Sequence, residues 1–218
     1  INCSREESGQ IFLKAYLQNN GLELGKDVEF EYVDNPTTAL EGLRSGQCDL
    51  FITNNAMGYS YSSSMDDIKV AGIPADVTGN YPCCRQNCSE EAYHKKFLSL
   101  VDFEIALIRG YDYYLNNKED VIKRLVEYSA QPKDYVEAAM YGTDSYRNVM
   151  DLSPDPHTKE VVEYYKAMMS IGEIEQSDYD MADYAVPFVY KKALDTLLER
   201  EPDNATYKKL AEDYPKYN

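Results

Sequence analysis

The chain has 218 residues, enough for one large domain or two small ones, and its hydrophobic content of 44% allows packed cores. Its formal net charge is −16, from 38 acidic and 22 basic residues, which argues against binding to nucleic acid or to an anionic membrane surface. No apolar run approaches the roughly 20 residues that a membrane-spanning helix needs.

The first predicted element is a helix over residues 8–20. Its apolar residues fall on one face at helical spacing, and they are Phe12, Leu13, Tyr16, Leu17 and Leu22. Ser8 is a favourable capping residue because its hydroxyl can accept from a free backbone N–H of the first turn. The pair Asn20-Gly21 is typical of a helix end.

A strand, a second helix and another strand are predicted to follow. Alternating apolar side chains predict a strand over 28–33. The next helix should begin at Pro36 and end at Gly46, and the short apolar run 49–52 suits a buried strand. Because strands alternate with helices, this part of the chain predicts an α/β fold with a mostly parallel sheet.

The stretch 8–55 also carries a series of short motifs whose order and spacing are hard to obtain by chance. They are Ser8-Gly9-x-x-x-Leu13-x-x-x-Leu17, Gly21-Leu22, Val28-x-x-x-x-Val33 and Ala39-Leu40-x-x-Leu43-x-x-Gly46-x-x-Asp49-Leu50. This series resembles the second lobe of type 2 periplasmic solute-binding proteins, and most of all the nitrate/sulfonate/taurine-type binding proteins of ABC importers with their thiamine-pyrimidine-binding relatives. The resemblance implies a type 2 periplasmic-binding-protein-like fold, with a mostly parallel sheet lobe followed by a helix-rich C-terminal part.

Ligand contacts are expected at a helix start, a strand end and one arginine. The residues are Ser8, Gly9, Gln10, Thr53, Asn54, Asn55 and Arg85. In the family the serine turn faces the interlobe cleft, and the free N–H groups of a helix start favour an anion or a polar oxygen. The residues 53–55 follow a predicted strand, at the edge where open α/β sheets bind ligands. Turn chemistry is the alternative for the two asparagines.

Two arginines have alternative interpretations. Arg85 is the only base in its neighbourhood, and in the cleft it would pair with a carboxylate, sulfonate or phosphate. Its alternative is a structural ion pair with one of the many acidic residues. Arg5 either leans over the cleft or pairs with Glu6 and Glu7 beside it.

The later elements are predicted mainly as helices. Residues 56–64 show no periodicity and indicate a loop, and 68–73 reads as a short strand. Helical patterns then cover 89–115, 118–129, 133–141, 158–171, 187–200 and 203–213. We therefore expect an α/β lobe over 1–85, and a mostly helical part over 86–218 that completes lobe two and contributes to the remnant of lobe one.

The five cysteines are an odd number, so at least one is unpaired within this chain. Cys48 lies where a small apolar residue is wanted. The group Cys83, Cys84 and Cys88 lacks the spacing of a structural zinc site, and a disulfide from Cys88 to either neighbour stays open. Thiamine-pyrimidine synthases share the implied fold and carry a cysteine-rich run associated with iron. An enzyme that uses this group is the alternative function. Both histidines, His94 and His157, are expected to be exposed.

The resemblance implies an extracytoplasmic solute-binding component of an ABC importer, periplasmic or anchored as a lipoprotein. It would bind a small polar or anionic solute reversibly in an interlobe cleft and deliver it to a membrane permease, with no catalytic residue, metal or cofactor. Only seven residues precede Ser8, so the N-terminal part of lobe one is expected to be missing, and a shorter homologue that starts here is the alternative. A chain without that part would expose apolar surface through which it can dimerise.

Overall fold

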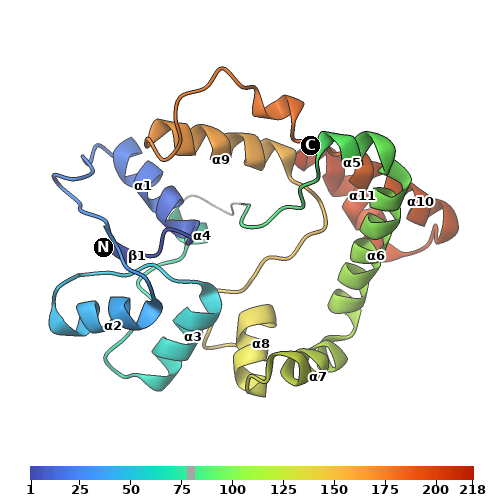
Figure 1. The fold of residues 1–218 in the computed structure, drawn as a ribbon. Helices are drawn as coiled ribbons and strands as arrows, with labels where there is room; N and C mark the ends of the chain where they lie inside the picture. The colour runs from blue at the N-terminus through green and yellow to red at the C-terminus, as the bar shows by residue number, and fades with distance from the viewer. Residues whose placement is uncertain (78–81) are drawn as a thin grey trace. The chain divides into compact units, whose positions relative to one another are not determined.

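The computed structural model describes residues 1–77 and 82–218 (Figure 1). It is mixed α/β and mostly helical, with a two-stranded parallel sheet in the described part. The chain divides into two compact units. Unit 1 comprises Ile1–Asn80, Val126–Met150 and Lys166–Ser177, and unit 2 comprises Tyr81–Leu125, Asp151–Tyr165 and Asp178–Asn218. The expected division at residue 85 lies near the first of these boundaries, but two later segments return to unit 1.

The sheet of unit 1 is built on β1 (Asn2–Cys3). This strand pairs in parallel with β2 (Glu31–Tyr32), and Asn2 also forms a parallel bridge with Phe51. On that second side the Asn2 N–H donates to the Leu50 carbonyl at 2.9 Å, and the Ile52 N–H donates to the Asn2 carbonyl at 2.9 Å. The segments therefore lie in the order β2, β1, Phe51, and the predicted parallel pairing is confirmed for this part of the chain.

The strands are shorter than predicted. The expected strand 28–33 is reduced to β2, because Gly25, at a φ of 82°, donates its N–H to the Val28 carbonyl at 2.8 Å and turns the chain back. The prediction of a strand over 68–73 is wrong. Ile68 is buried but Val70 is 41% exposed, so the segment lacks the burial that would favour a strand.

The helices that lie within unit 1 are α1 (Gly9–Asn19), α2 (Pro36–Ser45), α3 (Asn55–Ser64), α4 (Pro74–Val77) and α8 (Lys133–Tyr141). The second of them has the predicted limits. The Asn35 side chain accepts from the Thr38 N–H at 2.9 Å, and Gly46 closes the helix in the left-handed conformation. These two signals are local, which is why the sequence shows them.

α1 buries a different face from the predicted one. Its buried residues are Gln10, Ile11 and Lys14, whereas the expected apolar stripe at 12, 13, 16 and 17 is only partly buried. Ser8 precedes the helix in αR backbone geometry and makes no side-chain capping hydrogen bond, contrary to expectation. The polar side chains of Gln10 and Lys14 thus face the interior of unit 1.

α3 replaces the predicted loop over 56–64. The hydroxyl groups of Ser62 and Ser64 donate to the carbonyls of Gly58 and Ser60 inside the helix. The helix packs on α8. Tyr59 contributes ring contacts to Tyr135 and Tyr146, with centroids 6.4 Å and 5.2 Å apart. Tyrosine and serine contacts therefore stabilise a helix that has no apolar stripe.

Unit 2 is helical where it is described. Its elements are α5 (Glu90–Lys95), α6 (Phe97–Asn116), η1 (Met181–Asp183), α10 (Phe188–Arg200) and α11 (Ala205–Tyr217). The predicted helix over 89–115 is instead two helices, broken at Lys96, whose φ of −126° and ψ of 23° are not helical. α6, α10 and α11 enclose the core, with Ile108, Leu194 and Leu197 fully buried. α7 (Lys118–Ser129) and α9 (Thr158–Ser170) each run from one unit into the other.

Candidate functional site

The carboxyl edge of the parallel segments gathers three helix starts in unit 1. β1, β2 and Phe51 run in the same direction, so their carboxyl ends share one edge. The N-termini of α1, α2 and α3 follow these three segments in turn (Figure 1). Each helix N-terminus carries unpaired N–H groups and a partial positive charge. Such an edge is where open α/β sheets bind ligands.

Glu7 connects the starts of α1 and α3. Its half-buried carboxylate accepts hydrogen bonds from the side chain and the backbone N–H of Asn54. Burial raises the pKa of Glu7, and these hydrogen bonds offset part of the effect. Asn54 also caps α3, because its Oδ1 accepts from the Met57 N–H at 3.0 Å. A protein carboxylate therefore lies at the α3 N-terminus.

A buried chain of polar groups runs along the inner face of α1. The Lys14 Nζ donates to the Tyr32 hydroxyl at 2.6 Å and to Glu173 at 3.3 Å. The Tyr32 hydroxyl donates to Gln10 Oε1 at 3.4 Å. Burial lowers the pKa of Lys14, but the bonds to Tyr32 and Glu173 outweigh it and leave the pKa above its ordinary value. Lys14 is thus a charged structural anchor that fixes the position of Tyr32.

Arg5 is an exposed residue that places a positive charge next to Tyr32. Its guanidinium lies over the Tyr32 ring, 4.1 Å from the ring centroid. Within residues 1–77 and 82–218 it forms no ion pair, so the expected alternative of pairing with Glu6 or Glu7 is not seen there. With respect to these residues, its donors therefore remain available beside the carboxyl edge.

Two further polar atoms at this edge are buried and have no hydrogen-bond partner within residues 1–77 and 82–218. They are Gln10 Nε2, on a fully buried side chain, and Thr53 Oγ1. Buried polar groups are almost always hydrogen-bonded, because an unpaired one costs about 1–3 kcal/mol. A polar ligand group that reached either atom would recover that energy. Gln10 and Thr53 are both residues that the sequence predicts as ligand contacts.

Asn55 and Arg85, two other predicted contacts, are engaged elsewhere. The Asn55 Nδ2 donates to the Ala139 carbonyl at 2.8 Å, and the Asn55 carbonyl accepts from the Tyr146 hydroxyl. Arg85 belongs to unit 2, where it donates to the carbonyls of Pro156 and Cys84 at 2.8 Å and 2.7 Å. Burial lowers the pKa of Arg85. The structure thus gives Asn55 a role in linking α3 to α8.

The remaining predicted contacts lie at the edge itself: Ser8 and Gly9 at the start of α1, and Asn54 at the start of α3. Three residues of the site, Glu7, Lys14 and Tyr32, were not predicted. The sequence contains one feature that could have indicated the role of Lys14. Gln10 and Lys14 are four residues apart and so share one helix face, which the apolar count had assigned to solvent.

None of the five cysteines forms a disulfide. Cys48 is buried, as predicted, whereas Cys83, Cys84 and Cys88 are exposed, and the Sγ atoms of the first two lie 3.3 Å apart. His94 is exposed as expected. His157 is not, because its side chain is only 15% exposed. Among the described residues, no three His, Cys, Asp or Glu side chains gather closely enough to hold a metal ion.

Comparison with known proteins found no matching family model, no matching curated protein and no matching solved structure. In the part of the chain that the structure describes, no helix has the length and apolar character needed to cross a membrane.

Proposed function

We propose that this chain is a solute-binding protein with a type 2 periplasmic-binding-protein-like fold and serves as the extracytoplasmic component of an ABC importer. It binds a small polar or anionic solute reversibly at the carboxyl edge of unit 1 and delivers it to a membrane permease. One observation carries the proposal: the segments lie in the order β2, β1, Phe51, and three helix N-termini follow them at one edge.

The chemistry of the edge suits a solute with several oxygen atoms. Arg5 supplies a charged fork of donors, and Gln10 Nε2 supplies a buried neutral donor that has no partner among the described residues. The Thr53 hydroxyl can donate or accept. Glu7 already lies at the start of α3, so we expect the negative end of the solute nearer to Arg5 and the start of α1.

Native mass spectrometry of the purified chain, before and after denaturation, tests the proposal directly. A small mass that is lost on denaturation supports a reversibly bound solute and gives its class by weight. Thermal unfolding with nitrate, methanesulfonate, an aminopyrimidine or ethylamine then identifies the chemistry. An iron-sized mass that disappears when Cys83 and Cys84 are replaced by serine would instead support the enzyme alternative.

A pair of arginine variants locates the site. Arg5→Ala should weaken solute binding by about tenfold or more, the effect of losing one charge-assisted hydrogen bond. Arg44→Ala is the matched control, because Arg44 lies in the same unit and forms an exposed ion pair with Asp67 at 3.0 Å. Equal affinity in the two variants would contradict a site at the carboxyl edge.

A further inference from the structure

Unit 2 contains a pocket of about 150 Å³ that has no part in the proposed solute site. Its walls come from α6, α11 and the loop 151–157 that precedes α9. Leu115, Leu152 and Leu210 supply apolar surface. The other lining residues are polar, charged or aromatic, and their chemistry determines which ligands the pocket can bind.

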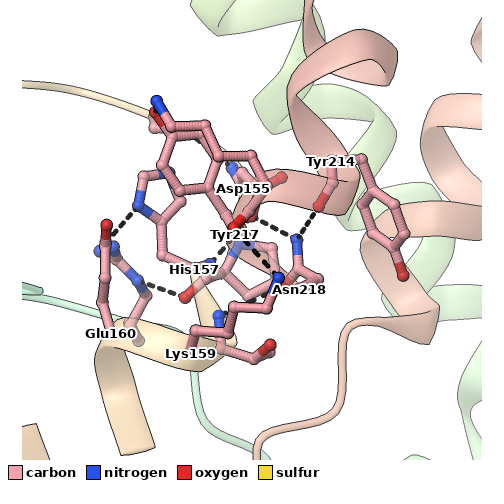
Figure 2. Close-up of polar contacts among 12 residues, drawn as sticks. Asp155, His157, Lys159, Glu160, Tyr214, Tyr217 and Asn218 are labelled. Atoms are coloured by element: carbon pink, nitrogen blue, oxygen red, sulfur yellow. Dashed lines mark hydrogen bonds and ion pairs between the residues drawn. The ribbon is translucent and has the colours of Figure 1, made fainter. Parts of the chain in front are cut away.

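Asp155 is the most informative wall residue. Its side chain is 2% exposed and lines the pocket. Oδ1 accepts from the His157 N–H at 2.9 Å and from Asn218 Nδ2 at 2.8 Å (Figure 2). Oδ2 is itself buried and has no hydrogen-bond partner among the residues that the structure describes. The carboxylate is therefore fixed through one oxygen, and its charge acts on the pocket that the residue lines.

The surrounding backbone holds this carboxylate in place. His157 adopts a φ of +50°, which is uncommon for a residue other than glycine. Its ring stacks on Tyr217 with centroids 3.9 Å apart and bonds to Glu160 through Nδ1 (Figure 2). Asn218 also accepts from the Thr158 N–H at 3.2 Å. The loop is thus tied to both α9 and α11, and the wall is preorganised.

The charge around the pocket is negative on balance. Three carboxylates line it, from Asp151, Asp155 and Asp213, and the only lysine among the lining residues, Lys209, is paired with Asp213 at 2.9 Å. Glu104 and Arg85 also act electrostatically on Asp155, with opposite signs. An anionic ligand would meet net repulsion here, whereas a cation would be attracted.

Two tyrosines complete the wall, Tyr111 from α6 and Tyr217 from α11. Aromatic rings attract organic cations through their π faces. We propose that this pocket binds a small organic cation, an alkylammonium ion whose charge is attracted by the carboxylates of Asp151, Asp155 and Asp213 and whose alkyl chain lies against the leucines and tyrosines. A cavity of about 150 Å³ suits a ligand of about five to seven non-hydrogen atoms.

Butylammonium is the probe for a first test, with 1-butanol and butyrate as neutral and anionic molecules of the same length. Isothermal titration calorimetry on the full chain should show binding of butylammonium at least about tenfold tighter than of either control. Amide chemical-shift mapping should place the perturbed signals in 151–157 and α11. Equal binding of 1-butanol, or perturbed signals confined to other segments, would overturn the inference.

Asp155→Asn tests the contribution of this carboxylate's charge. The asparagine Oδ1 can still accept from His157 and Asn218, so the loop is kept, but an amide replaces the unpartnered carboxylate oxygen. Butylammonium affinity should fall by about tenfold or more. Asp203→Asn is the control, because Asp203 lies in the same unit with a fully exposed side chain. If circular dichroism shows that Asp155→Asn is unfolded, Asp151→Asn takes its place, with a smaller loss expected. Unchanged affinity in a folded pocket variant refutes the proposal.

Discussion

Glu104 on α6 illustrates how one buried carboxyl sets a pH dependence. It is 6% exposed, and its Oε1 has no hydrogen-bond partner in the described part of the chain. Burial, and then the negative charge of Asp155, raise its pKa to about 7. The folded state therefore binds this proton more tightly than the unfolded state. Its contribution to stability is complete below the ordinary carboxyl pKa and is lost as the pH rises through 7.

Replacing Glu104 by glutamine should remove this pH dependence. The neutral amide keeps the shape of the protonated carboxyl, so the free energy of unfolding should lose this pH dependence. Relative to the original chain, the variant should gain on the order of 2 kcal/mol between pH 5 and pH 8. Urea unfolding at the two pH values measures the difference. A stability difference between variant and original that does not change with pH would show that Glu104 is charged throughout.

Gly42 on α2 provides a second prediction at the scale of one residue. A Cβ at this position would lie 2.8 Å from Asn2 Nδ2, on a side chain that is only 4% exposed. Gly42→Ala should therefore destabilise the fold by about 1–3 kcal/mol, since β1 cannot easily move aside. Gly110→Ala on α6 is the matched control, because nothing lies within 4 Å of its Cβ. It should be neutral or stabilising by up to about 1 kcal/mol. Thermal unfolding separates the two.

At the scale of elements, α3 and α8 are joined through one asparagine. Asn55→Ala removes the bond from Nδ2 to the Ala139 carbonyl and should cost about 1–2 kcal/mol in unfolding free energy. Tyr146→Phe, which removes the bond to the Asn55 carbonyl, should have a similar effect. Both variants should retain the affinity for solute. A loss of affinity without a loss of stability would restore the sequence-based assignment of Asn55 to the ligand.

Elements whose signals are local could be predicted from the sequence. α2 has its cap at Asn35 and its end at Gly46, both of which act within one turn. α3 could not be predicted, because its stability depends on tyrosine contacts with α8 and Tyr146, about 80 residues further along the chain. The prediction of a strand over 68–73 was wrong because a local pattern does not determine burial in the folded chain. Its apolar residues are suited to a sheet, but the fold leaves Val70 exposed.

In the candidate site, too, the residues with local signals were predicted and those that depend on distant partners were not. Gln10 was predicted from its place at a helix start, and Thr53 and Asn54 were predicted from the rule that ligands meet the carboxyl ends of parallel strands. Glu7 and Lys14 escaped notice because their roles depend on distant partners, Asn54 and Glu173. Arg85 was predicted to belong to this site, but it bonds to backbone carbonyls in unit 2. Its charge alone does not determine which of many possible acceptors it contacts in the folded chain.

At the scale of the whole molecule, unit 1 is assembled from three separate stretches of chain. The fragment 1–80 contains α3 but lacks α8, on which α3 packs. We therefore expect this fragment to fail to fold alone, since the α3 tyrosines would lose their partners. A two-dimensional NMR spectrum of the fragment should show the narrow dispersion of an unfolded chain. Native-like dispersion would mean that the parallel segments suffice without α8.

The interleaving of the two units also has a consequence for synthesis. The chain changes unit at five junctions, after residues 80, 125, 150, 165 and 177. Domains usually fold in turn as they leave the ribosome, the N-terminal one first. Here the first unit lacks its last stretch until residue 177 has emerged, by which time much of the second unit has been made. The two units must therefore mature almost together, and chaperones would meet the early α/β segments while their partners are still being translated.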